Sequence, residues 1–454
     1  MNKQQLLVWT WINSRKILLW GFWSLLTVGL IVYLLVILFG EEPSLFVPGG
    51  TSDGHYQIEL ACSACHTAFD GVSQKACIDC HGDELEAVDD SHPRKKFTDP
   101  RNAAKLALVD ARRCVPCHRE HRPAMTRAMG VTLAEDFCVY CHRDIAQDRP
   151  SHEELPFDGC RTCHLYHDNT ALHEDFLVKH LHEPEIRDPA TVPLRNLLAS
   201  YRHVAQHPVE TLTMADQDAP SGVDLADAAD WESSSHANSG VNCRDCHVDT
   251  TAAANQKKLW TDRPDHDACA SCHEQETTGF LAGRHGMRLA QGMTAMHPDM
   301  ARRPMKATSS KSLNCMACHP AHDFDTRQAA VEACLGCHDD EHSRAFKASP
   351  HYVLWQAEIE GRGAPGSGVS CATCHLPREV LKAKPEQRML VQHNQNLNLR
   401  PNQKMIRSVC MHCHGLGFTM DALADPALIE NNFAGKPARH IESVDMAAKR
   451  LDKQ

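Results

Sequence analysis

The chain has 454 residues and a formal net charge of −11, with only 6% aromatic residues against 22 cysteines and 31 histidines. The acidic balance excludes nucleic acid as a partner. A chain of this length ordinarily forms two or three domains around apolar cores, and here the supply of large apolar side chains for such cores is small.

The first predicted element is a membrane-spanning helix over residues 17–39, a run of 23 residues without a charge that is long enough to cross a bilayer. Lys3, Arg15 and Lys16 precede this run, and the next basic residue after it is Lys75. The positive-inside bias makes 1–16 a cytoplasmic tail and places everything beyond residue 40 outside. A cleaved signal peptide is the alternative. The apolar run is too long for one, and no A-x-A-like site follows.

Beyond the helix, one five-residue motif, C-x-x-C-H, recurs throughout the chain. It occurs eleven times and uses every cysteine: Cys62, Cys65, His66; Cys77, Cys80, His81; Cys114, Cys117, His118; Cys138, Cys141, His142; Cys160, Cys163, His164; Cys243, Cys246, His247; Cys269, Cys272, His273; Cys315, Cys318, His319; Cys334, Cys337, His338; Cys371, Cys374, His375; Cys410, Cys413, His414.

The motif count decides between three kinds of chemistry. A zinc site takes four ligands from two C-x-x-C units and has no use for a histidine after each pair. A thioredoxin-like dithiol needs a single copy beside a βαβ pattern. C-x-x-C-H is the attachment signature of c-type haem, in which the thiols bind the porphyrin and the histidine is the proximal iron ligand. We therefore predict eleven covalent haems c and no disulfides.

The motifs fall into two groups separated by 78 residues. We predict a five-haem domain over 40–213, an acidic linker over 214–235 and a six-haem domain over 236–454. The fold class expected is mostly irregular with short α-helices, many of them starting at or within a motif, packed around the haems. The glycine-rich segment 361–370 lacks a GK[ST] ending and is predicted as a flexible turn, not a phosphate-binding loop. Haem attachment places both groups in the periplasm, anchored to the bacterial inner membrane.

After the eleven proximal histidines are subtracted from 31, twenty remain, enough for a second histidine on every iron. In three motifs a further histidine follows three residues later, which on a helix lies on the same face and must therefore serve a neighbouring haem. The distal candidates are His55, His92, His121, His152, His167, His180, His203, His236, His285, His322, His342, His351 and His393.

Other side chains are weaker candidates for axial ligands. His173, His182 and His207 share the motif-free gap with two of the candidates above, and the sequence does not choose among them. His266, His297, His412 and His440 are rated lower. The methionines crowded between Met287 and Met305 could raise a haem potential as ligands, but methionine more often fills irregular gaps in packing.

With these motifs, the sequence resembles a membrane-anchored multihaem c-type cytochrome. The five-motif part is similar to the pentahaem and class III-like cytochromes c. The six-motif part carries CLGCHDDEHSRAFKASPHYVLWQAEIEGRGAPGSGVSCATCHLPRE (334–379) and resembles the octahaem hydroxylamine oxidoreductase and tetrathionate reductase group. Two departures weigh against an enzyme of these kinds: no tyrosine follows Tyr352 to cross-link to a catalytic haem, and no C-x-x-C-K occurs.

The function expected is electron transfer, with no catalytic residues. The protein would relay electrons from the quinol pool, or from a quinol-oxidising membrane complex, to a periplasmic redox partner. Two alternatives stay open. One is a terminal reductase or oxidase of a small nitrogen or sulfur compound, with one open haem site in 243–414; the other is a haem-bearing scaffold in a larger respiratory complex.

Overall fold

The structure, a computed structural model, describes residues 3–39, 47–134, 137–149, 152, 160–168, 174–194, 210–248, 259–309, 311–381 and 388–452. The chain divides into two compact units. The first consists of 1–64 and 118–132, and the second of 65–117 and 133–454. The domain boundaries expected from the sequence stay a prediction; residues 214–235 lie in the second unit and include a helix.

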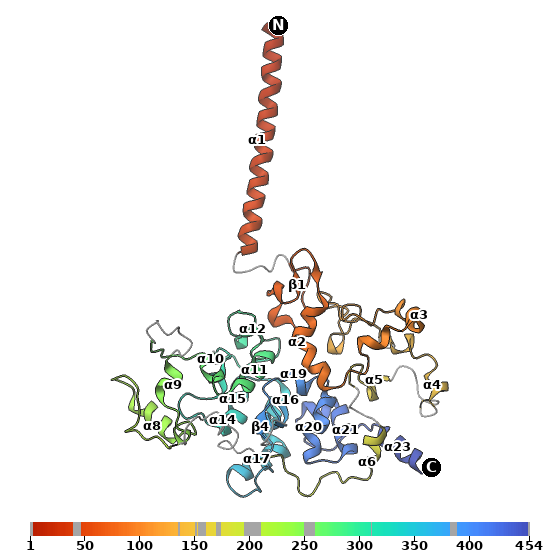
Figure 1. Cartoon of the computed structure of the whole chain (residues 1–454), viewed down its shortest axis with the longest axis vertical. Coiled ribbons are helices and arrows are strands. Elements are labelled where there is room, and N and C mark those ends of the chain that lie inside the picture. Colours follow the sequence, from red (N-terminus) through yellow and green to blue (C-terminus); the bar gives the residue numbers. More distant parts are fainter. Residues whose placement is uncertain are drawn as a thin grey trace. The chain divides into compact units, whose positions relative to one another are not determined.

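The first helix, α1, runs without interruption from Lys3 to Phe39 (Figure 1). It therefore begins earlier than residue 17, and most of the expected cytoplasmic tail is helical as well. Its stretch Ser14–Ile37 is 24 residues long, exposed, and apolar enough to cross a membrane. A membrane anchor and a signal sequence both have this form.

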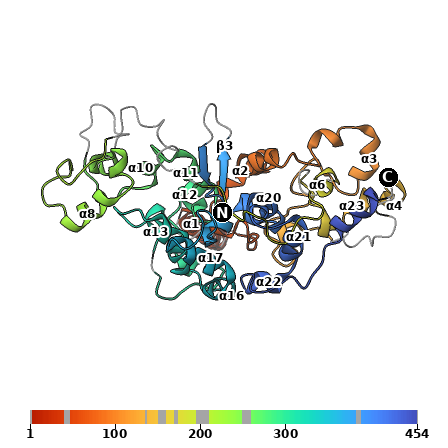
Figure 2. The ribbon, with the colours of Figure 1, turned by 90° about the horizontal axis from the view of Figure 1, so that it is seen from below.

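The other described helices are short and are joined by irregular segments (Figure 2). They are α2 Gln74–Ala87, α3 Ala103–Leu106, α4 Ile145–Asp148, α5 Cys160–Cys163, α6 Glu174–Lys179, α8 Leu225–Ser233, α9 Cys243–His247, α10 His266–Ala270, α11 Glu274–Ala282, α12 Met287–Ala290, α13 Cys315–Cys318, α14 Thr326–Ala330, α15 Glu332–Leu335, α16 Glu341–Ala345, α17 Pro350–Ile359, α18 Cys371–His375, α19 Asn396–Leu399, α20 Met405–Ser408, α21 Leu416–Ala424, α22 Pro426–Glu430 and α23 Ser443–Leu451.

The described strands form two small antiparallel hairpins. In the first, β1 His66–Thr67 pairs with β2 Gly71–Val72, so that His66 faces Val72. In the second, β3 Arg378–Leu381 pairs with β4 Arg388–Val391, with Arg378 opposite Val391. The mostly irregular architecture with short helices agrees with the fold class expected from the sequence.

Several helices begin at the first cysteine of a motif, as predicted, because a capping residue precedes it. Asn242 caps α9 in a capping box with Asp245, and Ser370 caps α18 in the same way with Thr373. Asn314 caps α13 by accepting from the Ala317 N–H. The thiols of these three motifs thus project from short, capped helical turns.

One prediction about these turns is wrong. Where a histidine follows three residues after a motif, the two were expected on one helical face. α13 ends at Cys318, and His319 is extended with φ −100° and ψ 104°. The next residue is Pro320, whose ring disfavours the α conformation in the residue before it. His322 has a positive φ of 71°, so the segment reverses direction instead of continuing the helix.

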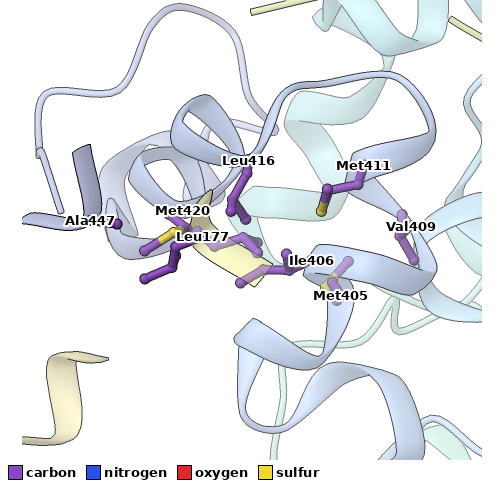
Figure 3. Close-up of a cluster of buried hydrophobic side chains, with 9 residues drawn as sticks. Leu177, Met405, Ile406, Val409, Met411, Leu416, Met420 and Ala447 are labelled. Carbon is purple, nitrogen blue, oxygen red and sulfur yellow. The ribbon is translucent and has the colours of Figure 1, made fainter. Parts of the chain in front are cut away.

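The larger apolar cluster lies where α6, α20, α21 and α23 meet (Figure 3). Its buried members are Leu177, Met405, Ile406, Val409, Met411, Leu416, Met420, Leu423 and Ala447. A smaller cluster joins Val331, Leu335 and Phe346, with Trp355 and Cys371 packed against it. Both clusters flank motifs of the six-motif region, so apolar packing fixes the helices that present those cysteines.

Candidate haem sites

The described histidines form a recurring arrangement in which the ring of a motif histidine faces the ring of a histidine outside any motif. Eight such pairs occur, with ring centroids 6.0–6.5 Å apart. They are His142–His92, His164–His152, His273–His236, His247–His322, His338–His285, His319–His393, His375–His342 and His414–His351. Every non-motif partner belongs to the set of distal candidates drawn from the sequence.

The separation of these rings fits a metal ion between them. With a metal–imidazole bond of about 2.0 Å and a nitrogen about 1.15 Å from its ring centroid, two rings on opposite sides of one ion are about 6.3 Å apart. The observed range of 6.0–6.5 Å brackets that value. Rings in direct contact, with no metal between them, also pack with centroids about 4.5–7 Å apart. The distance alone therefore does not distinguish a metal site from ordinary ring packing. The recurrence with one motif histidine in each pair is what singles out a haem site.

The same donor set does not suit zinc. Among the described residues, no group of three or more His, Cys, Asp or Glu side chains is placed to hold a metal ion. A structural zinc needs four protein ligands, whereas a haem iron has four porphyrin nitrogens and takes at most two ligands from the protein. Two imidazoles beside two cysteine thiols are therefore the residues that a bis-histidine c-type haem requires.

The hydrogen bonds of the rings leave one particular nitrogen for the iron. Nδ1 of His92 lies 2.5 Å from the Tyr166 carbonyl oxygen, and Nδ1 of His247 lies 2.7 Å from that of Thr261. Nδ1 of His393 and of His414 bond in the same way to the carbonyls of Val391 and Glu185. A carbonyl accepts only from N–H, so these contacts place the proton on Nδ1, which is the tautomer that binds a metal through Nε2.

Burial keeps several of these histidines neutral, which is the protonation state that binds a metal. Burial lowers the pKa of His285 and of His375 to about 4, helped by neighbouring histidines. The pKa values of His236 and His351 fall to about 4 for the same reasons. At neutral pH these imidazoles are uncharged before any metal binds.

Two segments tie neighbouring sites together by supplying a histidine to each of two pairs. Motif histidine His319 faces His393, while His322, three residues later, faces His247 of another motif. His338 faces His285, and His342 faces His375 in the same manner. Each of these histidines lies beside a histidine of another motif, and its role as a ligand of a neighbouring haem stays a prediction; the helical reasoning behind that prediction was wrong.

The cysteines show that consecutive motifs of the six-motif region are neighbours in space. Cys246 lies near Cys269, and the Cys269 thiol is within hydrogen-bonding reach of Cys315. Next along the chain, Cys318 lies near Cys334, and the Cys334 thiol is within hydrogen-bonding reach of Cys371. Cys374 completes the series: burial and the nearby Cys410 and Cys413 raise its pKa to about 12. Sequence order is therefore spatial order from residue 243 to residue 414.

The remaining distal candidates have polar contacts. Nδ1 of His55 lies 2.7 Å from Glu120 Oε1, and Nδ1 of His121 lies 2.7 Å from the Gly49 carbonyl oxygen. Nδ1 of His167 bonds to Asp90, and that of His180 to Glu183. Each contact involves Nδ1, the ring nitrogen that an imidazole bound to a metal through Nε2 does not use. His203 lies outside the described residues. The roles of these five histidines, like those of the paired ones, stay predictions.

Two histidines outside the set of distal candidates hydrogen-bond through Nε2, the nitrogen that would otherwise bind iron. His440 has Nδ1 2.9 Å from Asp421 and Nε2 2.7 Å from Asp445. His297 has Nε2 2.9 Å from the Ser312 hydroxyl. In this arrangement neither presents a free Nε2.

Sequence reasoning missed the carboxylates that hold these rings. Burial opposes ionisation of Glu120, but hydrogen bonds from His55 and Ser52 lower its pKa to about 2. Burial also opposes ionisation of Glu84, whose pKa is nevertheless lowered by His81 and Lys404. Glu84 follows His81 by three residues on α2, and that spacing on a predicted helix was a usable signal. Glu120 bonds to a histidine 65 residues away, and no local pattern announces such a contact.

Comparison with known proteins agrees with this arrangement for one part of the chain. Residues 54–143, which include His66, His81, His118 and His142, match the cytochrome c3 family of multihaem c-type cytochromes. No curated protein and no solved structure is significantly similar to the chain. The chain thus contains a cytochrome c3 domain at residues 54–143, the domain of multihaem electron carriers that bind c-type haems.

Proposed function

We propose that the protein is a membrane-anchored periplasmic electron-transfer protein that carries eleven covalent haems c. It accepts electrons from the quinol pool or from a quinol-oxidising membrane complex and passes them to a periplasmic redox partner. The observation that supports this proposal is the set of eight histidine pairs. Their ring centroids lie 6.0–6.5 Å apart, which is the separation expected for two imidazoles on opposite sides of one iron.

The bound haems supply one-electron exchange at iron. The protein's own residues fix the spacing, the axial ligands and the burial of each site. Two imidazoles held by their Nδ1 hydrogen bonds keep the same positions in both oxidation states, so little reorganisation accompanies electron transfer. Because consecutive motifs between 243 and 414 are neighbours in space, electrons can pass through this region in chain order.

The open-site alternative receives less support from this arrangement. Each of the six motif histidines between 243 and 414 faces a second imidazole. If both histidines of each pair held the iron, a substrate would have no free coordination position there. The pairing therefore supports a carrier over a terminal reductase or oxidase, and no observation favours the scaffold as a separate function.

Haem quantitation with low-temperature spectroscopy tests the proposal. The purified holoprotein should carry eleven haems by pyridine haemochrome assay, all low-spin when oxidised, with no spectral change on adding nitrite, hydroxylamine or sulfite. The His285→Ala variant should convert one haem to a high-spin form that binds added imidazole, because it removes the ring facing His338.

The matched control is His440→Ala, which removes a histidine whose two nitrogens already contact Asp421 and Asp445. It should leave the spectrum unchanged. A native high-spin signal that responds to nitrite or sulfite would favour the enzyme, and far fewer than eleven haems would overturn the proposal. Separately, detergent but not high salt or carbonate should release the protein if Ser14–Ile37 is an uncleaved anchor.

A further inference from the structure

The histidine of the motif Cys77–His81 has a carboxylate within hydrogen-bonding distance of its Nδ1 atom. It lies within α2, and Glu84, one helical turn further on, has Oε2 3.4 Å from Nδ1 of His81. The Glu84 side chain is 23% exposed, so water screens its charge only partly. The histidine of this motif therefore has an ionised carboxylate as its neighbour.

A second residue from a distant part of the sequence holds that carboxylate. Lys404 Nζ forms an ion pair with Glu84 Oε1 and donates to the Asn396 carbonyl oxygen at 3.1 Å. The lysine side chain is only 9% exposed. The exposed pair Lys75–Asp79 on the same helix is 79% and 54% exposed and is a weak surface contact by comparison.

Two other motif histidines have neutral acceptors, whereas Nδ1 of His338 lies 3.8 Å from a carboxylate oxygen of Asp340. Nδ1 of His118 lies 3.3 Å from the Gly130 carbonyl oxygen, and that of His247 lies 2.7 Å from the Thr261 carbonyl oxygen. A carboxylate at this position attracts the ring proton more strongly than a carbonyl and raises the basicity of the ligating nitrogen. A more basic ligand, together with a negative charge nearby, stabilises ferric iron over ferrous iron.

We propose that Glu84 and Lys404 are positioning residues that set the reduction potential of the haem on Cys77–His81. Glu84 lowers that potential through His81, and Lys404 raises it by neutralising Glu84. This inference rests on the proposed function, because it requires a haem at this motif. Lys404 immediately precedes α20, which leads into the motif Cys410–His414, so the six-motif region adjusts a site of the five-motif region.

The test compares potentiometric titrations of four holoprotein variants. Glu84→Gln should raise the potential of one haem, and Lys404→Met should lower it. Loss of a hydrogen-bonding partner of a metal-bound histidine changes metal affinity or activity by about 10-fold to 100-fold. We expect a change at the lower end of this range in the oxidised-to-reduced ratio of the haem. A tenfold change in the oxidised-to-reduced ratio corresponds to about 59 mV for one electron. In each variant, the part of the titration curve that shifts should correspond to one electron, because the potential of one haem changes.

Glu86→Gln is the matched control, since Glu86 is an exposed carboxylate on the same helix. It should leave the titration curve unchanged, and Lys404→Arg should restore a curve close to wild type. Shifts of equal sign in Glu84→Gln and Lys404→Met, or an equal shift in Glu86→Gln, would show a merely structural role and overturn the inference.

Haem quantitation separates this failure from failure of the proposed function. Replacing Cys77 and Cys80 by alanine should remove one haem from the total. If it removes none, no haem is attached there and the proposed function fails at this motif. If one haem is lost while the variant potentials do not move in opposite directions, the function stands and the tuning role is wrong.

Discussion

The two groups of motifs differ in what surrounds them. Between 243 and 414, all six motif histidines face a second histidine, and two buried apolar clusters flank the motifs. In the described residues from 47 to 168, the buried side chains are polar: Thr51, Ser52, Gln57 and Thr132. Among all described residues, the buried apolar side chains lie at Leu177 and beyond.

This difference shows that one chain can use two sources of stability. A fully buried leucine or methionine contributes about 1.5–3 kcal/mol relative to an exposed one, and the cluster around Leu416 contains several. The five-motif region has no comparable set in its described part, so its fold must depend on the apolar faces of its haems. The six-motif region combines both sources.

The largest expected effect therefore comes from withholding haem. In chain produced without haem attachment, residues 47–149 should be cleaved by protease at rates approaching those of an unfolded chain. Relative to the holoprotein we expect an increase on the order of 100-fold, because cleavage tracks the open population. Residues 405–447, which keep the apolar cluster, should be cleaved more slowly.

Limited proteolysis followed by mass spectrometry of the fragments measures this directly, with the holoprotein digested in parallel as the control. Equal resistance of the two regions in the haem-free chain would contradict the comparison. It would mean that the polar five-motif region has a stabilising core of its own.

Much of this arrangement was predictable from local sequence. The C-x-x-C-H motifs predicted the haem chemistry, their capping residues Asn242 and Ser370 account for the short helices that start there, and the charge-free run predicted α1. These features depend on residues a few positions apart. The apolar cluster around Leu416 was not predicted, because its members come from segments spread between residues 177 and 447.

The pairing of the histidines could not be predicted either, because the two members of a pair are far apart in the sequence. His319 faces His393 across 74 residues, and His236 faces His273 across 37. Such pairings follow from how irregular segments fold back over a cofactor, and no periodicity in the sequence encodes that path. The sequence could name the candidates, whereas only the three-dimensional arrangement orders them into pairs.

A smaller effect, confined to the six-motif region, is expected from the loop before Cys371. This glycine-rich segment, predicted as a flexible turn, is held by Glu358 of α17. One carboxylate oxygen accepts from the Gly366 N–H at 2.8 Å, and the other accepts from the Gly368 N–H at 2.5 Å. Gly366 has φ +82°, which favours glycine there. The loop leads directly into Ser370, the cap of α18.

Glu358→Ala should lower the free energy of unfolding by about 2 kcal/mol, because two part-buried N–H groups lose a charged acceptor. Chemical denaturation measures the loss, and hydrogen exchange should quicken at Gly366 and Gly368 but not in residues 47–134. Glu360→Ala is the control, since Glu360 forms only an exposed ion pair with Arg362 and its loss should cost less than about 0.5 kcal/mol. Faster exchange across both regions would instead show that their stabilities are not separable.

The smallest effect concerns the edge of the larger apolar cluster, where His440 contacts Asp421 of α21 and Asp445 of α23. Hydrogen bonds that His440 donates to these two carboxylates raise the pKa of His440 to about 9. Because the folded pKa lies above the unfolded value of about 6.5, the stabilisation is complete below about pH 6.5 and is lost as pH rises through about 9. The side chain is 56% exposed, so solvent screening limits the contribution to under about 1 kcal/mol.

Hydrogen exchange of α23, corrected for intrinsic rates, should therefore show less protection at about pH 10 than at about pH 6, and His440→Gln should remove that dependence. His297→Gln is the control, because His297 contacts the neutral Ser312 hydroxyl. The expected haem spectrum is unchanged in both variants. A pH dependence of α23 that persists in His440→Gln would assign it to other groups.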